Sequence, residues 1–534
     1  MRAPFVLAAL MLALSTGLSL HSLPAQAAAH AAPAPSGPSV AWLDAANDAD
    51  IDRAQAQARS EKKPLLLYWG ASWCPPCNQL KATLFNRADF IERSRSVVAV
   101  NIDGDLPGAQ KLASRFKVRG YPTLILMNPD GGEITRLPGE AAAPQVLRLL
   151  QLGLSGGRPV KALLADAVQH KPLKPQEWQA LAWYSWDTDE SQLVLAGEGA
   201  SVLADLAVAC PRSETEASNR LLLKALAMSN EAQGIQPDAA LRQRVIKLLG
   251  DARASRAQMD VLSNFAREIT LALAPEPGAT RDQVLRAFEP ALQRLQADAS
   301  LSRADRLGAV SARVELARLD QPKTSVNPKL PPALTRQVSE HVARDDREIQ
   351  NTYERQAVIT NGAYTLGRAG LWAQSEAMLK ASLPRSPAPY YLMSQLGDQA
   401  RKRGLNDEAV SWYEQAWARS EGPATRLQWG AALIGALTEL TPQNAARIEQ
   451  VARQILAEGA KDPASFHERS ARALQRVGAR LSAWNRDGSH DAVLRRLVDG
   501  PDGLLATCSR LGNADDQRTL CDNLAISLGA GRKG

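Results

Sequence analysis

The pattern of apolar positions divides the chain near Gly157 into a part with strands and helices and a longer part with helices alone. Before that point, four short runs rich in apolar or β-branched residues are typical of strands: 65–69, 97–103, 123–127 and 133–138. The segments around them have helical spacing: 44–60, 78–85, a short turn with Phe90 and Ile91, 107–116, and a last helix beginning at Pro144. Parallel β-α-β units followed by a hairpin predict an α/β fold, one mixed sheet with helices on both faces.

Helical spacing then continues to the end of the chain. Gly370-Leu371 and Gly404-Leu405 recur at a period of about 34 residues. Small residues near both pairs allow two helices to approach closely. The copies at 356–387 and 390–420 resemble the tetratricopeptide repeat, a two-helix unit. That resemblance implies an all-α solenoid of degenerate repeats over 156–534, and a non-repeating helical bundle is the alternative.

The first residues have the layout of a secretory signal. Arg2 gives a positive charge, Phe5 to Leu20 an apolar stretch, and Ala25-Gln26-Ala27 a cleavage site of small residues. We expect residues 1–27 to be a cleaved signal peptide, with an uncleaved membrane anchor as the alternative. Residues 28–40, rich in alanine and proline, are expected to form a disordered leader. The mature chain is then predicted to be exported, periplasmic and not embedded in the membrane.

Composition and charge argue against several classes of function. The chain has 534 residues, more than one hydrophobic core holds, and its hydrophobic fraction of 45% is ordinary for globular domains. The net charge of +7 comes from interspersed acidic and basic residues, as in 344–348, so we expect no nucleic-acid partner. No Gly-x-x-x-x-Gly-Lys loop is present in the sequence, and neither nucleotide hydrolysis nor a cofactor is predicted.

The clearest chemical signal is Trp73-Cys-Pro-Pro-Cys77, which lies between a predicted strand and a predicted helix. Two thiols at this spacing can close a small disulfide ring, and the free N–H groups at the start of a helix stabilise a thiolate. Cys74 is then the exposed nucleophile. Cys77, about one turn into the helix and more buried, resolves the mixed disulfide. Pro75 and Pro76 restrict the turn and remove backbone donors near the sulfurs.

Three further cysteines lie outside this motif. In an oxidising compartment we expect Cys508 and Cys521 to form a structural disulfide. Cys210 is left over, and we expect it to be buried and inert rather than reactive. For the pair Cys74 and Cys77, the alternatives to redox chemistry are a zinc site and an inert structural disulfide. The six histidines show no ligand spacing, so no metal site is predicted.

Three separated motifs carry a resemblance to a known family: Trp73–Cys77, Asn101-Ile-Asp103 and Arg119-Gly-Tyr-Pro-Thr123. In this order and spacing they resemble a thioredoxin-fold domain, which would cover residues 41–155. Among thioredoxin-fold proteins, the motifs most resemble those of the bacterial exported thiol:disulfide interchange proteins. The implied fold is a mixed central sheet flanked by helices, in agreement with the pattern of apolar positions.

The resemblance also implies roles for single residues. It makes Pro122 a cis-proline beside the disulfide, and it makes Trp73 and Tyr121 substrate-binding residues, with Tyr121 offering backbone hydrogen bonds to an extended client. Many members of the family have a buried acid and a lysine near the disulfide. At those positions this chain has Tyr68 and Ala99, which predicts slow or partner-restricted exchange.

The predicted function is that of an exported thiol:disulfide oxidoreductase, a reductase or interchange enzyme that acts on protein disulfides while the helical region docks the client. Its partners would be protein thiol or disulfide clients and a membrane or soluble thiol donor or acceptor. The alternative is a non-catalytic solenoid scaffold that binds a protein or peptide and keeps a vestigial thioredoxin module. The intact pair of Cys74 and Cys77 favours the enzyme.

Overall fold

The computed structural model describes residues 39–137, 139, 143–188, 192–195, 197–229, 233–511 and 516–529. The chain from Ser39 onward forms one compact unit. The predicted signal peptide (1–27) and most of the predicted leader (28–40) lie outside the described residues. Val40, at the end of that leader, is 7% exposed and packs in a hydrophobic core.

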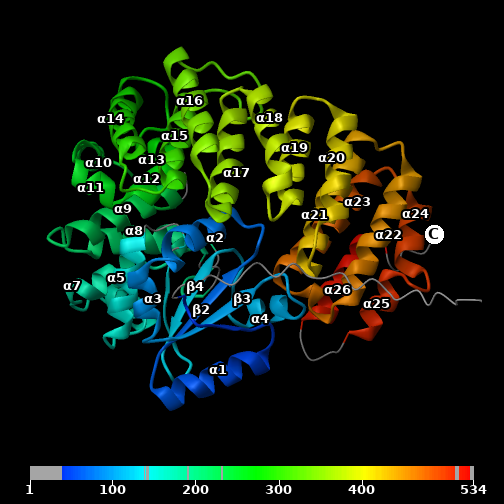
Figure 1. The fold of residues 1–534 in the computed structure, drawn as a ribbon, viewed down its shortest axis with the longest axis horizontal. Helices are drawn as coiled ribbons and strands as arrows, with labels where there is room; N and C mark the ends of the chain where they lie inside the picture. The colour runs from blue at the N-terminus through cyan, green and yellow to red at the C-terminus, as the bar shows by residue number, and fades with distance from the viewer. Residues whose placement is uncertain are drawn as a thin grey trace, which may run out of the picture. The chain divides into compact units, whose positions relative to one another are not determined.

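Five strands form one mixed sheet in the order β1-β3-β2-β4-β5. Figure 1 labels the three central strands, β2, β3 and β4. β1 and β2 both pair with β3 in parallel, and β4 pairs with β2 and β5 in antiparallel orientation. The mixed sheet predicted from the apolar pattern is confirmed. The bounds are β1 Trp42–Asp44, β2 Leu65–Gly70, β3 Val98–Asp103, β4 Thr123–Met127 and β5 Glu133–Leu137.

The strand β1 is absent from the sequence prediction, which placed a helix over 44–60. Asp44 instead ends β1, and its carboxylate accepts a hydrogen bond of 2.8 Å from the Asn101 side chain. The helix α1 (Asp48–Glu61) begins later because Asn47 caps it, in a capping box with Asp50. A strand of three residues is too short for an alternating pattern to reveal it.

Both faces of the sheet are covered, as the unbroken apolar sequence of β2 requires. Leu65, Leu67 and Trp69 point to one face, where they join a core with α1 and α4 (Ala109–Arg115). Leu66 and Tyr68 point to the other, where their core continues into α3 (Ala88–Ser94), α5 (Ala143–Leu154) and helices that follow α5. Between β2 and α3, the helix α2 (Pro75–Leu80) runs into a π-helix, η1 (Lys81–Phe85).

From residue 155 onward the described chain has helices and no strand, which confirms the predicted helical region. Figure 1 labels helices of this region from α7 to α26, and its colours follow them along the chain from cyan through green and yellow to red. Their bounds are α6 Val160–Val168, α7 Pro175–Ala182, η2 Trp186–Thr188, α8 Gly199–Ala209, α9 Thr215–Met228, α10 Ala239–Gly250, α11 Ala252–Ala257, α12 Met259–Asn264, α13 Ala266–Leu273, α14 Ala279–Ala297, α15 Arg303–Ala317, α16 Pro332–Glu348, α17 Thr352–Arg368, α18 Trp372–Ser382, η3 Leu383–Arg385, α19 Pro389–Lys402, α20 Asn406–Arg419, α21 Pro423–Leu440, α22 Ala445–Lys461, η4 Pro463–Phe466, α23 Glu468–Trp484, α24 Asp491–Asp499, α25 Leu504–Arg510 and α26 Gln517–Ser527.

The two glycines of the suspected repeat occupy equivalent turns. Gly370 follows α17 with φ of 78°, and Gly404 follows α19 with φ of 75°, a left-handed conformation that favours glycine. A Cβ at Gly397 would lie 3.2 Å from the ring of Tyr413, so α19 and α20 approach closely at this small residue. The tetratricopeptide resemblance itself stays a prediction.

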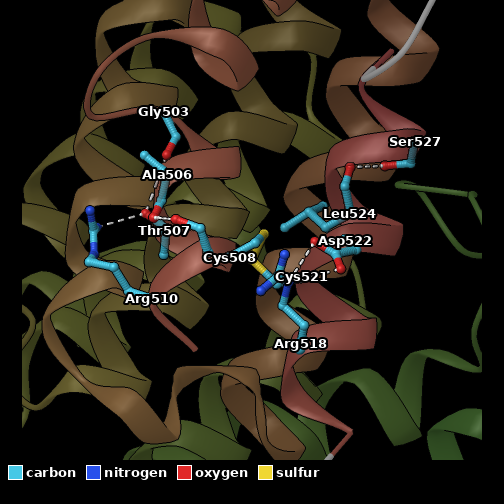
Figure 2. The surroundings of a disulfide bond; sticks show 11 residues. Gly503, Ala506, Thr507, Cys508, Arg510, Arg518, Cys521, Asp522, Leu524 and Ser527 are labelled. Atoms are coloured by element: carbon cyan, nitrogen blue, oxygen red, sulfur yellow. Dashed lines mark hydrogen bonds and ion pairs between the residues drawn. A yellow bond between two sulfur atoms is a disulfide. The ribbon is translucent and has the colours of Figure 1, made fainter. Parts of the chain in front are cut away.

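A disulfide joins Cys508 on α25 to Cys521 on α26 (Figure 2). Both cysteines are fully buried, and their Cα atoms are 5.5 Å apart. Cys210 is buried and not disulfide-bonded. Burial raises the pKa of the Cys210 thiol to about 12, and a thiol with so high a pKa is a poor nucleophile. In the ranges that the structure describes, no helix combines the length and apolar character needed to cross a membrane.

Candidate redox site

Cys74 and Cys77 form a disulfide at the start of α2, directly after the loop that leaves β2. Their Cα atoms are 5.3 Å apart. Pro75 and Pro76 occupy the first helical positions, where a missing N–H costs nothing. Cys74 is the N-cap residue, and its sulfur accepts a hydrogen bond of 3.2 Å from the Cys77 N–H. After reduction, the same N–H would favour the thiolate form of Cys74.

Asn78 holds this turn together, a role that the sequence reading missed. Its side chain is 1% exposed, and its Nδ2 donates to the carbonyl of Ser72 at 2.8 Å and to that of Cys74 at 2.9 Å. The two bonds fix the loop on both sides of Cys74. The sequence did carry one sign of this role, because a polar amide stands directly after the second cysteine, in the predicted helix.

The structure brings two of the predicted substrate-binding residues to the disulfide. Trp73 and Tyr121 both pack against the small cluster that contains Cys74 and Cys77, and their ring centroids are 6.5 Å apart. The peptide bond between Tyr121 and Pro122 is cis. The Tyr121 hydroxyl accepts a hydrogen bond of 2.9 Å from Gln110, which fixes the ring.

Residues of the helical region also reach this site. Tyr391 on α19 stacks on Trp73 with the ring centroids 5.9 Å apart, and Trp429 on α21 meets Trp73 edge-on at 5.5 Å. Gln356 on α17 donates to the Trp73 carbonyl at 3.4 Å. Sequence reasoning could not find these residues, because nothing in a helix sequence states which distant loop it will contact.

A polar network centred on Asp105 also joins the part of the chain that contains the sheet to the helical region. Asp105 accepts hydrogen bonds from the Trp73 indole N–H at 2.9 Å and from the Thr425 hydroxyl at 2.6 Å. It also forms an ion pair with Arg469 on α23. The Arg469 guanidinium lies 5.0 Å from the Trp73 ring centroid and 5.5 Å from that of Tyr121. This cation therefore faces both rings that flank the disulfide.

Cys74 is only 2% exposed and Cys77 is fully buried. The sequence reading expected Cys74 to be exposed, and the structure differs. The physical reason is that the helical region packs around this turn: α17 lies against α2, and Tyr391 on α19 and Trp429 on α21 contact the Trp73 ring beside the disulfide.

The positions of the family's acid and lysine hold Tyr68 and Ala99, and both are buried on one face of the sheet. Burial raises the pKa of Tyr68, and the hydroxyl lies against Gly70 with no hydrogen-bond partner among the described residues. Other positions supply an acid and an amine. Burial raises the pKa of the Asp103 carboxyl at the end of β3, and burial lowers the pKa of the Lys81 amine, each group partly opposing the shift of the other.

Within the described residues, no three His, Cys, Asp or Glu side chains come together as a set of metal ligands. A dithiol of this geometry can exchange with another disulfide by two successive displacements at sulfur.

Residues 51–153 match a family model described as a thioredoxin-like domain. This part of the chain is thioredoxin-like. Over 107 residues (19% of this chain and 18% of the relative) it is 32% identical to the thiol:disulfide interchange protein DsbD 2 of Pseudomonas aeruginosa. Over 84 residues (16% of this chain and 66% of the relative) it is 37% identical to thioredoxin H5 of Arabidopsis thaliana.

A solved thioredoxin from Thermus thermophilus is 25% identical, with 20% of this chain and 85% of that chain covered and a TM-score of 0.19. The chain spans less than a fifth of the length of the interchange protein DsbD 2. The similarity therefore concerns the thioredoxin-like domain, and the helical region has no counterpart in that alignment.

Proposed function

We propose that the protein is a thiol:disulfide oxidoreductase, a reductase or interchange enzyme that acts on protein disulfides through Cys74 and Cys77. The observation that carries this proposal is the position of the disulfide, at the N-terminus of α2 and beside both Trp73 and the cis bond of Tyr121–Pro122. An inert structural bridge has no need of these neighbours. The relatives that match this domain, named as interchange proteins and thioredoxins, support the same chemistry.

In this proposal the Cys74 thiolate attacks one sulfur of a client disulfide, and the client's other sulfur leaves as a thiolate. The Cys77 thiolate then attacks the Cys74 sulfur, which breaks the mixed disulfide and releases the second client thiol. Two electrons pass to the client, and the bond between Cys74 and Cys77 forms again. A membrane or soluble dithiol must then reduce that bond. In the oxidising direction the client reduces the bond between Cys74 and Cys77, and a thiol acceptor takes the two electrons from the resulting dithiol.

The proposal assigns the remaining parts of the chain as follows. Trp73 and the backbone of Tyr121 contact the client, and the helical region docks it. Export to a periplasm rests on the signal-like pattern of residues 1–27. A tetratricopeptide-like surface would suit docking, since solenoids bind partners along extended faces.

Reduction of insulin by dithiothreitol, followed by turbidity, tests the proposal. Wild-type protein is expected to accelerate the reaction, and Cys74→Ser to return it to the uncatalysed rate because the nucleophile is gone. Cys210→Ser is the matched control, since that cysteine is buried and not part of a disulfide, and its rate should equal that of wild type. Equal rates for wild type and Cys74→Ser would contradict the enzyme and favour the scaffold with a vestigial domain.

Trapping identifies the clients. In Cys77→Ser the mixed disulfide on Cys74 cannot be resolved, so covalent adducts should accumulate and separate under non-reducing conditions. Mass spectrometry of these adducts names the client proteins. The double variant Cys74→Ser with Cys77→Ser should give none.

A further inference from the structure

We propose that four residues of the helical region, Tyr391, Thr425, Trp429 and Arg469, form a cover that determines which disulfides reach Cys74. The cover admits small disulfides in preference to protein disulfides, and protein clients react only after it has moved away. This inference rests on the proposed function, because it concerns substrate choice at the same dithiol.

The cover lies where a client would have to bind. Trp73 and Tyr121 flank the disulfide, and the cover occupies faces of both rings, through the stacking of Tyr391 and the guanidinium of Arg469. Exchange requires a client sulfur to reach the attacking sulfur directly. With Cys74 2% exposed, a folded protein surface has no route to it in this arrangement.

Two parts of the helical region are attached to the redox domain in different ways. One face of the sheet shares a continuous hydrophobic core with α6 and the helices that follow it as far as α15. Among the described residues, the separate core of α19 to α26 includes a single side chain of the redox domain, the partly buried Trp73. Although α23 also packs on α4, separation of the part that bears the cover would leave the core of the sheet covered by α6 to α15.

Polar contacts hold the cover in place. Asp105 accepts from Thr425 and pairs with Arg469, and the Arg469 backbone N–H donates to Gln110 at 2.9 Å. Such contacts exchange with water when an interface opens, so their loss costs less than the loss of an apolar core. A small disulfide needs only a local fluctuation of these side chains, whereas a protein needs the two surfaces to separate.

Gly422, just before α21, offers a way to wedge the interface open. A Cβ at this position would lie 2.6 Å from the Cβ of Asp105, and the residue has φ of 82°. Gly404 has φ of 75° and nothing within 4 Å of such a Cβ. Both substitutions place a side chain at positive φ, with the larger strain at Gly422 because its ψ is 141°, but only Gly422→Ala also pushes a Cβ against the redox domain.

Each protein is reduced, freed of reductant and mixed with either insulin or bis(2-hydroxyethyl) disulfide, and loss of the dithiol is followed by alkylation and mass spectrometry. In Gly422→Ala the ratio of the insulin rate to the small-disulfide rate is expected to rise about tenfold, the effect of removing about 1.4 kcal/mol of closure free energy. Gly404→Ala should keep the wild-type ratio. An unchanged ratio in Gly422→Ala, with the small-disulfide rate retained, overturns the cover.

A second pair of variants addresses the ion pair. Arg469→Gln removes the pairing with Asp105 and should also raise the ratio. Arg426→Gln is its match, because Arg426 pairs with Glu458 at 3.2 Å and lies 5.6 Å from the Trp417 ring, all within the helical region. A rise in both variants, or in neither, counts against the cover. Failure of the proposed function looks different, since Cys74→Ser would then react with both substrates as wild type does.

Discussion

At the scale of single residues, the chain has a buried acid and a buried amine that influence one another, at positions that family resemblance does not indicate. Asp103 pairs in register with Gly70 at the end of β2, and burial raises the pKa of its carboxyl. Lys81 follows α2, and burial lowers the pKa of its amine. The resemblance pointed to Tyr68 and Ala99 and correctly found no acid or lysine there. It could not find the groups that stand elsewhere, because their proximity depends on side-chain packing.

Replacing Asp103 with Asn should therefore change how stability depends on pH. The ordinary pKa of the carboxyl is 3.8, and the folded value is higher. Above 3.8 the unfolded chain ionises first, so it binds fewer protons than the folded chain, and wild-type stability falls as pH rises through the folded pKa. Asn cannot ionise, and it can keep the hydrogen bond that Oδ1 accepts from the Asp105 N–H. Relative to wild type, Asp103→Asn should become more stable as pH rises.

Urea unfolding at a series of pH values from about 4 to 8 measures this effect. Asp89→Asn is a control of opposite sign, because hydrogen bonding to Arg87 lowers the pKa of the Asp89 carboxyl, so its ionised form contributes stability above 3.8. That contribution is small, since the Asp89 side chain is 47% exposed. A stability difference for Asp103→Asn that is independent of pH would show that the carboxyl pKa is not raised.

At the scale of elements, the sequence predicted those strands and helices whose signal lies in neighbouring residues. The apolar run of Leu65–Trp69, the cysteines and the helix after them form one continuous signal, and β2 and α2 lie where it places them. β1 was not predicted, because a strand of three residues that pairs with a distant strand leaves no periodic pattern in the sequence. The pairing of Cys508 with Cys521 could be predicted from the expected oxidising compartment and the spacing, but the two helices that it joins could not.

Removing that disulfide should destabilise the end of the chain. The bond closes a loop with a sequence separation of 13, and loss of such a link costs about 3 kcal/mol by the chain-entropy model. The double variant Cys508→Ser with Cys521→Ser should therefore show faster amide hydrogen exchange in α25 and α26, while insulin reduction stays at the wild-type rate. Exchange equal to that of wild type would mean that packing alone holds these helices, and lost activity would place this disulfide in the redox cycle.

At the scale of the whole molecule, the apolar pattern changes near Gly157 from strands and helices to helices alone. This change marks a change of secondary structure and not the edge of a hydrophobic core. Leu66 on β2, Leu124 on β4 and Leu163 on α6 lie in the same hydrophobic cluster. A boundary at residue 155 would cut through it. The sequence could not show this, because the apolar faces of β2 and α6 each look complete as patterns, and only the tertiary structure shows that they cover one another.

This shared core predicts that a core substitution in α6 also destabilises the sheet. Leu163 and Leu497 are each 1% exposed, but Leu497 lies in the separate core of α19 to α26. Truncation of either to Ala should cost about 2–5 kcal/mol. Only Leu163→Ala should speed amide hydrogen exchange in β4 and β5, because α6 contacts β5 directly. If β4 and β5 exchange alike in the two variants, the sheet is stabilised independently of α6, and residues 41–155 form a self-sufficient domain as the sequence alone suggests.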